Sequence, residues 1–542
     1  MEYSVKLLNF LKDNVTSYEL QFFTVTDVAK SIIDFNLYLK GNSDSINYGL
    51  ILSSLFTPIE LFKNIQFSQW TFLKVRSYYS DITEQKLNEI LDNEKLLFRH
   101  LKEYFEIIQI RTTRVVNSIS SIKINPYSKS ELETCDKIHL TLHDFQIRVK
   151  DRMSNLLIHN GKERVLVQMP TGSGKTRTAI EFLIDHVRAN AASLNEHNIY
   201  LWFTNSVELS EQAFNTFVEL WKFRGDRTVG AHKLHGSAKS ELLFDQLCDE
   251  NISIVFIGFQ KFQALFNSSN YSDSRLLQLL REDNVISVVD EAHISLATTY
   301  DRAIEYVSSF NRSKLIGLTA TPGRNSLMLG GAGNVQLAQK FHFNLVELSF
   351  KESLDRSPIE NLQELGYLAK VDFNEIENYS RLAANSPIEL LAFDLERNKK
   401  ILQVIEDRYD ESKSVLVFSA STEHSVILKA CLDALSIPSE IIDSHSDIDS
   451  RSHYISDFKS GKLRVLINFG VLSTGFDAPI LNCLVIARPI SSLVLFSQIM
   501  GRALRGPKNG GNEKNEVVIV KDKMINYPNA DFLYSYWSSF WN

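Results

Sequence analysis

The sequence predicts an α/β protein with two parallel-sheet domains in tandem, preceded by a mainly helical segment. From about residue 138 onward, short and almost continuously apolar runs alternate with longer stretches of helical spacing. Such runs are typical of strands in parallel sheets that helices cover on both faces. Before residue 130 the apolar residues follow helical spacing instead, as in the run from Glu84 to Ile110. Two sets of such runs therefore indicate two sheets behind one helical segment.

Three structural units are expected along the 542 residues, a length that suits three or four domains. We place a helical accessory domain over residues 1–135, a first sheet domain over 136–345 and a second over 346–542. The glycines between Asn325 and Asn334 indicate a flexible connection. The expected strands begin at Val165, Ile199, Ser253, Val285 and Lys314 in the first sheet, and at Ser414, Leu463, Asn482 and Glu516 in the second.

Composition places the chain among ordinary globular proteins, with 44% hydrophobic and 23% charged residues. Its four cysteines are scattered and form no CxxC pair, which argues against a zinc ribbon or a disulfide framework and favours a reducing compartment, the cytoplasm. No run of about 18 apolar residues is present, and the first residues lack a basic-then-apolar signal. We therefore expect neither a membrane partner nor secretion.

The net charge of −7 is a mild argument against a nucleic-acid partner. It does not exclude one, because local charge rather than total charge governs the binding of phosphate. The stretch from Arg111 to Ser130 contains four basic residues and no acid. It is either a contact for a nucleic-acid backbone or, more simply, a solvated linker.

A phosphate-binding loop is expected in VLVQMPTGSGKTRTAIEFL, where an apolar strand leads through small residues into a helix. Successive backbone amides and the helix N-terminus supply positive potential to phosphate oxygens. Lys175 reaches the outer phosphates of ATP, and the Thr176 hydroxyl can ligate Mg²⁺. Met169 stands where the first glycine of the pattern is usual. We assign nucleotide binding to the run Thr171, Gly172, Ser173, Gly174, Lys175 and Thr176. A chance glycine-rich turn would not explain the strand before it and the helix after it.

A second element, VVDEAH, ends an apolar strand in two carboxylates. Asp290 stands where a metal-holding acid is needed, and Glu291 can orient or deprotonate an attacking water. The alternative is a pair of solvated acids at the start of a helix, which the apolar run and the upstream loop make weaker.

DEAH after a GKT loop resembles the superfamily 2 helicases and translocases. The resemblance spans roughly residues 138–525, leaves out residues 1–130, and implies two RecA-like domains with ATP and Mg²⁺ between them. LHDFQ is similar to the segment whose glutamine reads adenine, which implies that role for Gln146. FTNSVELSEQ resembles the first strand-binding motif and implies nucleic-acid contacts for Thr204 and Gln212, although Asn205 replaces a usual proline.

Further stretches resemble family motifs in the expected order, and that order carries more weight than any one residue. GLTATP resembles the motif that couples hydrolysis to movement, VLVFSAS the start of the second domain's nucleic-acid face, and NFGVLSTGFDAP a motif that touches both strand and nucleotide. Taken singly, their polar residues are more often turn, cap or strand-end residues. The resemblance implies functional roles for Thr319, Thr321, Ser419, Thr474, Gly475 and Asp477.

QIMGRALRG resembles the final motif, with Gln498, Arg502 and Arg505. An arginine from the second domain that faces the γ-phosphate stabilises charge developing during transfer. Arg505 is the expected finger and Arg502 assists it. A surface basic patch is the alternative for either arginine alone, but the spacing Q-x-x-G-R-x-x-R after TGFDAP argues against it.

The expected function is an ATP-dependent motor on nucleic acid, DNA more than RNA. TGFDAP and GRALRGPKNGGN look most like bacterial motors of the restriction-enzyme and excision-repair type, which often serve phage defence. No nuclease motif is visible, so such a role needs a separate effector or nuclease. An ATP-gated clamp that recruits an effector and an RNA-remodelling helicase are the alternatives.

Overall fold

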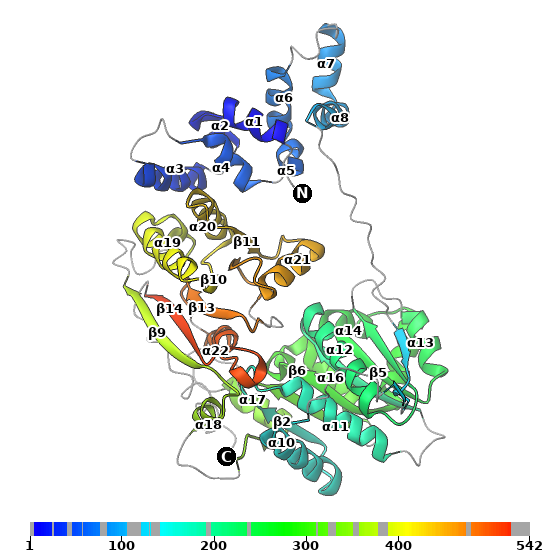
Figure 1. Ribbon diagram of the computed structural model, residues 1–542. Coiled ribbons are helices and arrows are strands. Elements are labelled where there is room, and N and C mark those ends of the chain that lie inside the picture. Colours follow the sequence, from blue (N-terminus) through cyan, green and yellow to red (C-terminus); the bar gives the residue numbers. More distant parts are fainter. Residues whose placement is uncertain are drawn as a thin grey trace.

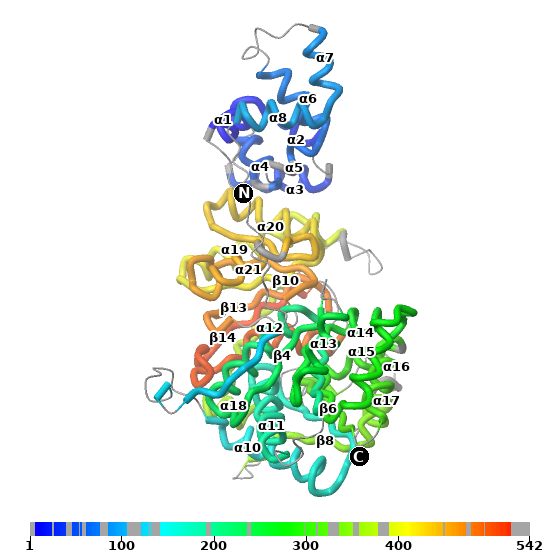
Figure 2. The backbone as a smooth tube through the Cα atoms, turned by 90° about the vertical axis from the view of Figure 1, so that its right-hand side faces the viewer, coloured from blue at the N-terminus to red at the C-terminus, as the bar shows by residue number. Residues whose placement is uncertain are grey.

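The computed structural model contains three parts: a helical N-terminal part and two sheet domains (Figures 1 and 2). None of the helices described in it is long and apolar enough to cross a membrane. The residues described are 5–23, 26–40, 46–56, 58–75, 84–105, 121–128, 130–131, 141–190, 197–235, 240–310, 313–322, 332–350, 357–377, 388–472, 478–490 and 492–521.

Among the described residues up to Tyr104, every element of the N-terminal part is a helix, as the sequence predicts. Asparagine side chains begin three of its helices: Asn47, Asn64 and Asn93 each accept a hydrogen bond from a backbone N–H of the first turn. The helices are α1 (Val5–Asn14), α2 (Ser17–Phe23), α3 (Thr26–Lys40), α4 (Tyr48–Leu55), α5 (Pro58–Lys63), α6 (Ile65–Lys74), α7 (Glu84–Asp92) and α8 (Glu94–Tyr104).

The first sheet has eight strands in the order β1-β4-β5-β3-β6-β7-β2-β8, and every pair is parallel except β1 with β4. Helices cover both faces: along β3, Tyr200 and Trp202 enter one apolar core, and Leu201 and Phe203 enter the other. The strands are β1 (Ser121–Ile124), β2 (Arg164–Gln168), β3 (Asn198–Thr204), β4 (Val229–Leu234), β5 (Ile252–Gly258), β6 (Asn284–Asp290), β7 (Lys314–Thr319) and β8 (Leu345–Val346).

The helices of this domain lie in two layers. One layer contains α10 (Asp144–Ser154), α11 (Lys175–Ala189) and α12 (Val207–Arg224). The other contains α13 (Ser240–Cys248), α14 (Phe259–Phe266), α15 (Tyr271–Glu282), α16 (Thr298–Ser308) and α17 (Ala332–Lys340). Most of the expected connection from Asn325 to Asn334 lies outside the described residues, and its last three positions already belong to α17.

The second sheet has six parallel strands in the order β11-β12-β10-β13-β14-β9. They are β9 (Lys370–Glu377), β10 (Ser414–Phe418), β11 (Ser439–Ile442), β12 (Val465–Asn468), β13 (Leu481–Ile486) and β14 (Lys514–Lys521). One face carries α19 (Leu395–Asp410) and α20 (Thr422–Ala434), and the other carries α21 (Ile448–Lys459) and α22 (Leu493–Ala503). Helix α18 (Pro358–Glu364) packs on the core of the first domain. Two parallel-sheet domains in tandem confirm the expected fold class.

Strand β1 extends the first sheet domain toward the N-terminus. Ser121–Ile124 lies before the expected boundary at 135, yet it pairs antiparallel with β4 at the edge of the first sheet. Lys123 is therefore part of a strand and not of a solvated linker. Arg111 and Arg114, the other end of that basic stretch, lie outside the described residues.

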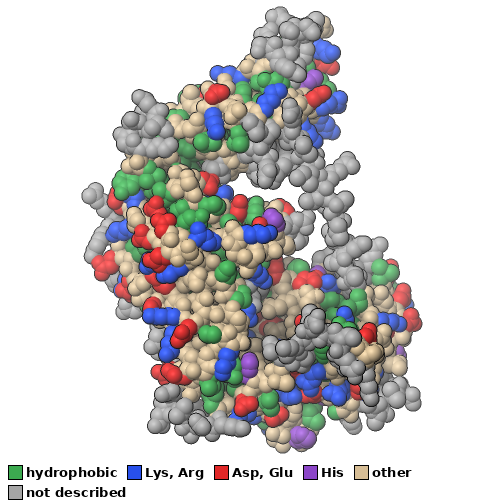
Figure 3. Space-filling view, in the orientation of Figure 1, with side chains coloured by type: hydrophobic (Ala, Val, Ile, Leu, Met, Phe, Trp, Pro, Cys, Tyr) green, Lys and Arg blue, Asp and Glu red, His purple; other side chains and the backbone are tan. Residues whose placement is uncertain are grey.

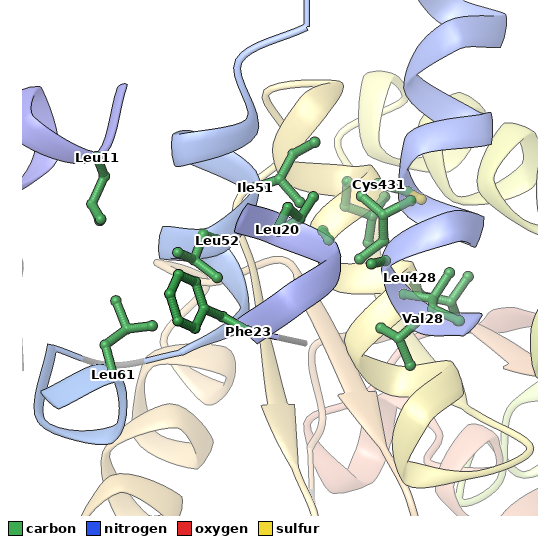
Figure 4. Close-up of a cluster of buried hydrophobic side chains, with 14 of the residues drawn as sticks. Leu11, Leu20, Phe23, Val28, Ile51, Leu52, Leu61, Leu428 and Cys431 are labelled. Atoms are coloured by element: carbon green, nitrogen blue, oxygen red, sulfur yellow. The ribbon is translucent and has the colours of Figure 1, made fainter. Parts of the chain in front are cut away.

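The helical part packs against the second sheet domain, although the chain leads from it into the first. Helices α3 and α4 contact α20, and α3 also contacts α19. Val28 of α3 and Leu428 and Cys431 of α20 belong to one buried apolar cluster (Figure 4). In both views of the backbone this part lies over the α19–α20 layer, away from the first domain (Figures 1 and 2). A shared core of this kind ties the helical part to the second domain.

Charge is spread unevenly over the surface. Figure 3 shows Asp and Glu side chains gathered over α19, a helix that contains Glu396, Glu406, Asp407 and Asp410. The same helix also contains four basic residues, Arg397, Lys399, Lys400 and Arg408, so its formal net charge is zero.

Candidate functional site

The loop between β2 and α11 has a backbone that only glycine adopts readily. Gly172 and Gly174 both have φ of +85°, in the left-handed region. A Cβ at Gly174 would collide with the Gln146 side chain. The Ser173 hydroxyl donates to the Pro170 carbonyl at 2.6 Å and closes the turn. The loop thus curls in front of the N-terminus of α11, an arrangement that suits an anion.

This loop forms one wall of a cavity of about 440 Å³ between the two sheet domains. The first domain contributes His143, Gln146, Thr171, Gly172, Gly174, Lys175, Thr176, Arg177, Asp290 and Glu291, and the second contributes Ala478, Gly501, Arg502, Arg505, Lys508, Asn509 and Gly510. Most of the predicted nucleotide-binding and catalytic residues therefore meet in one place. Ser173 and Gln498 are buried and do not line the cavity, and Gly475 and Asp477 lie outside the described residues.

Asp290 ends β6 and Glu291 follows it; both are buried, at 2% and 8% exposure. Burial and the neighbouring Glu291 raise the pKa of Asp290 to about 7, against the opposing effect of Lys175. Within the described part of the chain, Asp290 Oδ2 and Glu291 Oε2 are buried oxygens that accept no hydrogen bond. Two such oxygens beside Thr176 fit a hard divalent cation, which would also favour the ionised form of Asp290.

Glu291 adopts φ of +56°, in the left-handed region that non-glycine residues rarely enter. Backbone strain of this kind persists where the surroundings fix it, often at functional sites. His293 lies next to it, with Nδ1 at 3.6 Å from Glu291 Oε2 and 3.4 Å from Thr319 Oγ1. On its other side, His293 Nε2 lies 3.5 Å from Gln498 Nε2 of the second domain. His293 thus joins the acidic pair, the Thr319 turn and the final motif.

His293 is the last residue of DEAH, and the sequence alone predicted no role for it. Thr319 belongs to the same chain of contacts: its hydroxyl donates to the Thr321 carbonyl at 2.8 Å and accepts from the Thr321 N–H at 3.0 Å. Both threonines are buried, at 0% and 1% exposure. They shape a turn beside the acidic pair and offer no surface to a nucleic acid.

Gln146 is buried, and its amide is already engaged at both ends. Its Nε2 donates to the Ser173 carbonyl and its Oε1 accepts from the His143 N–H, each at 2.9 Å. A primary amide retains one further N–H and one further lone pair after these two bonds. Gln146 therefore lines the cavity and keeps enough hydrogen-bonding capacity to bind a nucleotide base. It also connects its own segment to the phosphate loop.

Tyr367, Lys508 and Asn509 lie at this end of the cavity, and the sequence alone predicted a role for none of them. The rings of Tyr367 and His143 lie 4.3 Å apart, and Lys508 Nζ lies 4.5 Å from the centre of the Tyr367 ring. Asn509 Nδ2 donates to the carbonyls of Tyr367 at 2.9 Å and of Gly172 at 3.2 Å. The segment after the final motif therefore touches the phosphate loop directly.

The arginines of the final motif are carried to the cavity by α22. A Cβ on Gly501 of this helix would collide with Thr171, so the helix approaches the phosphate loop closely. Arg502 is near enough to lower the pKa of Lys175, although burial is the larger cause. Arg505 follows α22 and forms an isolated antiparallel bridge with Leu368. Both arginines line the cavity.

The expected nucleic-acid residues are placed less uniformly. Thr204 and Ser419 are fully buried at strand ends, where their hydroxyls bond within their own loops at 3.3 Å to Ser206 O and 3.2 Å to Ser421 O. Gln212 of α12 lines the cavity that contains Lys175. Thr474, Gly475 and Asp477 lie outside the described residues.

Comparison with known families finds two matches, one on each sheet domain. Residues 139–324 match the family described as type III restriction enzyme, res subunit, and residues 396–507 match the helicase conserved C-terminal domain. Neither match reaches the helical N-terminal part.

Relatives of the chain are distant. The putative ATP-dependent helicase IRC3 of Saccharomyces cerevisiae is 24% identical over 67% of this chain and 49% of its own length. The type I restriction enzyme EcoKI endonuclease subunit of Escherichia coli is 22% identical over 64% of this chain and 32% of its own. This chain spans about half the length of the IRC3-type relatives it matches. A fragment of a putative HsdR subunit of a type I restriction enzyme from Vibrio vulnificus has a similar fold, with 20% identity, a TM-score of 0.50, and coverage of 79% of this chain and 70% of that one.

Proposed function

We propose that this chain, a member of the superfamily 2 helicases and translocases that resembles restriction-enzyme motors, hydrolyses ATP between its two RecA-like domains to move along or remodel nucleic acid. One observation carries the proposal. A single cavity is lined by the phosphate loop, by the buried acids Asp290 and Glu291, and by two arginines of the other domain. Groups that come from both domains can act on one triphosphate only while the cleft is closed.

Each group in the cavity has a separable task in this proposal. The loop amides and Lys175 hold the phosphates, and Thr176 and Asp290 hold Mg²⁺, which would neutralise charge on the phosphate oxygens. Glu291 orients the attacking water. Arg505, assisted by Arg502, stabilises the charge that develops on the γ-phosphate.

The contacts around the cavity supply a route from hydrolysis to movement. His293 lies between Glu291 and Gln498, so loss of the γ-phosphate would change the contact between His293 and the second domain. Gln146 holds the base and bonds the phosphate loop. The cleft would close when ATP binds and open after hydrolysis. Each domain would then bind the nucleic-acid strand tightly in one state and weakly in the other.

Of the two nucleic acids, DNA is the favoured substrate. The protein would act in the cytoplasm within a bacterial phage-defence or repair system. That system would supply a separate effector or nuclease. The support is the similarity to restriction-enzyme subunits, and the DEAH sequence fits a motor of that kind. An RNA-remodelling enzyme and an ATP-gated clamp would use the same cavity.

A panel of nucleic acids tests the proposal. ATP hydrolysis is measured with single-stranded DNA, duplex DNA and RNA, together with strand displacement, for the wild-type chain and for Lys175→Ala. We expect stimulation by DNA and no hydrolysis by the variant. Stimulation by RNA alone would favour remodelling of RNA, and stimulation without displacement or translocation would favour a clamp. Wild-type turnover by a folded Lys175→Ala variant would overturn the site.

A further inference from the structure

A stack formed by an exposed tyrosine, an exposed arginine and a half-buried phenylalanine lies on the first sheet domain, outside the nucleotide cavity. Tyr271, the first residue of α15, is 75% exposed, and Leu242 of α13 is 61% exposed. The guanidinium carbon of Arg275 lies 4.2 Å from the centre of the Phe244 ring and 5.7 Å from that of Tyr271. Arg275 thus lies near one ring of each helix, and both Arg275 and Tyr271 are exposed.

This stack lies at the C-terminal edge of the sheet. The two helices begin side by side, because Ser272 donates to Glu241 at 2.7 Å and Ser240 bonds Asp273. Helix α15 ends at the opposite edge, where the Asp283 carbonyl accepts from the N–H of Ile199 at the start of β3. Its 12 residues span about 18 Å, which places Tyr271 near the ends of the strands.

The same edge carries the residues that the proposed function uses. Thr204 ends β3 and Asp290 ends β6, while α13 and α14 follow β4 and β5 further along. Strand β5 is four positions from β2 in the sheet, which corresponds to about 19 Å at a spacing of about 4.8 Å. The stack is therefore well separated from the phosphate loop, along the edge that a bound strand would follow.

Charges of both signs surround the stack. Lys261 acts on Asp273, Asp245 and Asp249 lie with Arg275 around Cys248, and Asp273 and Glu241 each accept a hydrogen bond from a serine hydroxyl. Such a surface does not concentrate phosphate. It offers flat π-faces and a stacked guanidinium, which suit the uncharged face of a nucleobase.

We propose that Tyr271 and Arg275 form a stacking platform for a base of single-stranded nucleic acid, part of the strand path across the first domain. The inference rests on the proposed function and adds a contact outside the motifs. Bases of every kind stack on aromatic rings, so the platform binds without sequence preference.

The test is the affinity of the full chain for a labelled oligothymidylate of about 20 nucleotides, measured at several salt concentrations. Tyr271→Ala weakens binding about tenfold, Tyr271→Phe restores it, and Arg275→Ala shows a smaller loss. Because stacking releases no counterions from phosphate, the dependence of affinity on salt keeps its slope in Tyr271→Ala. Basal ATP hydrolysis without nucleic acid stays unchanged and reports an intact fold.

Arg281, on the same helix, provides the matched control. It lies 4.7 Å and 4.4 Å from the ring centres of Tyr306 and Phe310, at the end of α15 away from the platform. Arg281→Ala leaves oligonucleotide affinity unchanged. Wild-type affinity in Tyr271→Ala, or an equal loss in Arg281→Ala, overturns the platform while leaving the motor proposal intact. A wild-type chain that binds no nucleic acid overturns both.

Discussion

Arg451 of α21 donates a hydrogen bond to Glu208 of α12 at 3.0 Å and so joins the second sheet domain to the first. Burial acts to raise the pKa of Glu208, but hydrogen bonds from its own backbone and from Arg451 hold it below its ordinary value. Arg451 also donates to the Asp443 carbonyl at 3.1 Å, which fixes its direction. The ion pair therefore fastens the two domains together.

Breaking this pair should loosen the closed arrangement in the absence of nucleotide. Arg451→Ala removes a partly exposed interaction of about 0.2–1 kcal/mol, enough to shift a balanced opening equilibrium severalfold. Fluorescence energy transfer between labels on α12 and α21 should report a larger mean distance. The exchange Arg451→Glu with Glu208→Arg should restore the wild-type distance, and if it leaves the domains open, the pair is not what holds them.

The helical part should move as one body with the second domain. Val28 and Leu428 share a buried cluster, so ATP should change the distance from α8 to α16 and leave that from α8 to α21 constant. Val28→Asp buries a charge in this contact and should separate the two parts. Leu73→Asp, at a residue of α6 that is 51% exposed, is the matched control and should have no such effect. A constant distance to α16 in the presence of ATP would contradict the motion.

Removal of Arg505 should slow hydrolysis far more than it weakens ATP binding. A finger acts mainly on charge in the transition state and contributes on the order of 10³–10⁵ in rate in well-studied nucleotide hydrolases. Binding rests largely on the loop amides and Lys175. Lys508→Ala is the comparison, because Lys508 lines the same cavity but lies over Tyr367. It should raise KM with little change in kcat. A fast Arg505→Ala enzyme would place the finger elsewhere.

Glu291→Gln should bind ATP with Mg²⁺ and fail to hydrolyse it. Asp290 and Thr176 remain to hold the metal, whereas the carboxylate that orients water is lost. The variant should stay closed on nucleic acid when ATP is added, which a gel-shift or anisotropy measurement detects. Asp290→Asn should instead lose the dependence of ATP binding on Mg²⁺. Normal turnover by Glu291→Gln would show that another group handles the water.

Stability should fall in mild acid because of His186. Burial lowers the pKa of this imidazole to about 4, and its Nδ1 lies 3.0 Å from the Tyr200 hydroxyl. The unfolded state, with a pKa near 6.5, therefore binds more protons between these values, so the free energy of unfolding decreases as pH falls from about 6.5 towards 4. His186→Asn should show a shallower decrease in urea titrations over that range. Equal slopes would assign the acid sensitivity to other groups.

The local pattern of the sequence was sufficient for the parts of the site that follow strands. All nine expected strands are present, and the phosphate loop and the acidic pair stand where apolar runs end. Strands β1, β4, β8, β9 and β11 were not expected. Residues of β9 are mostly exposed, and β8 has only two residues, so neither gives an apolar run that can be recognised.

Tertiary structure alone decided which distant surfaces meet. The apolar stripe on α3 predicts that one face of this helix is buried. It does not predict that α20 covers this face rather than the first sheet, which is nearer in the sequence. Asn509 reaches the phosphate loop, and Tyr367 reaches His143, because the segments after α22 and α18 pack there. The periodicity of apolar residues indicates how much apolar surface each element must bury. The partner that hides it is chosen by shape and by the free energy of the whole packing, summed over residues hundreds of positions apart.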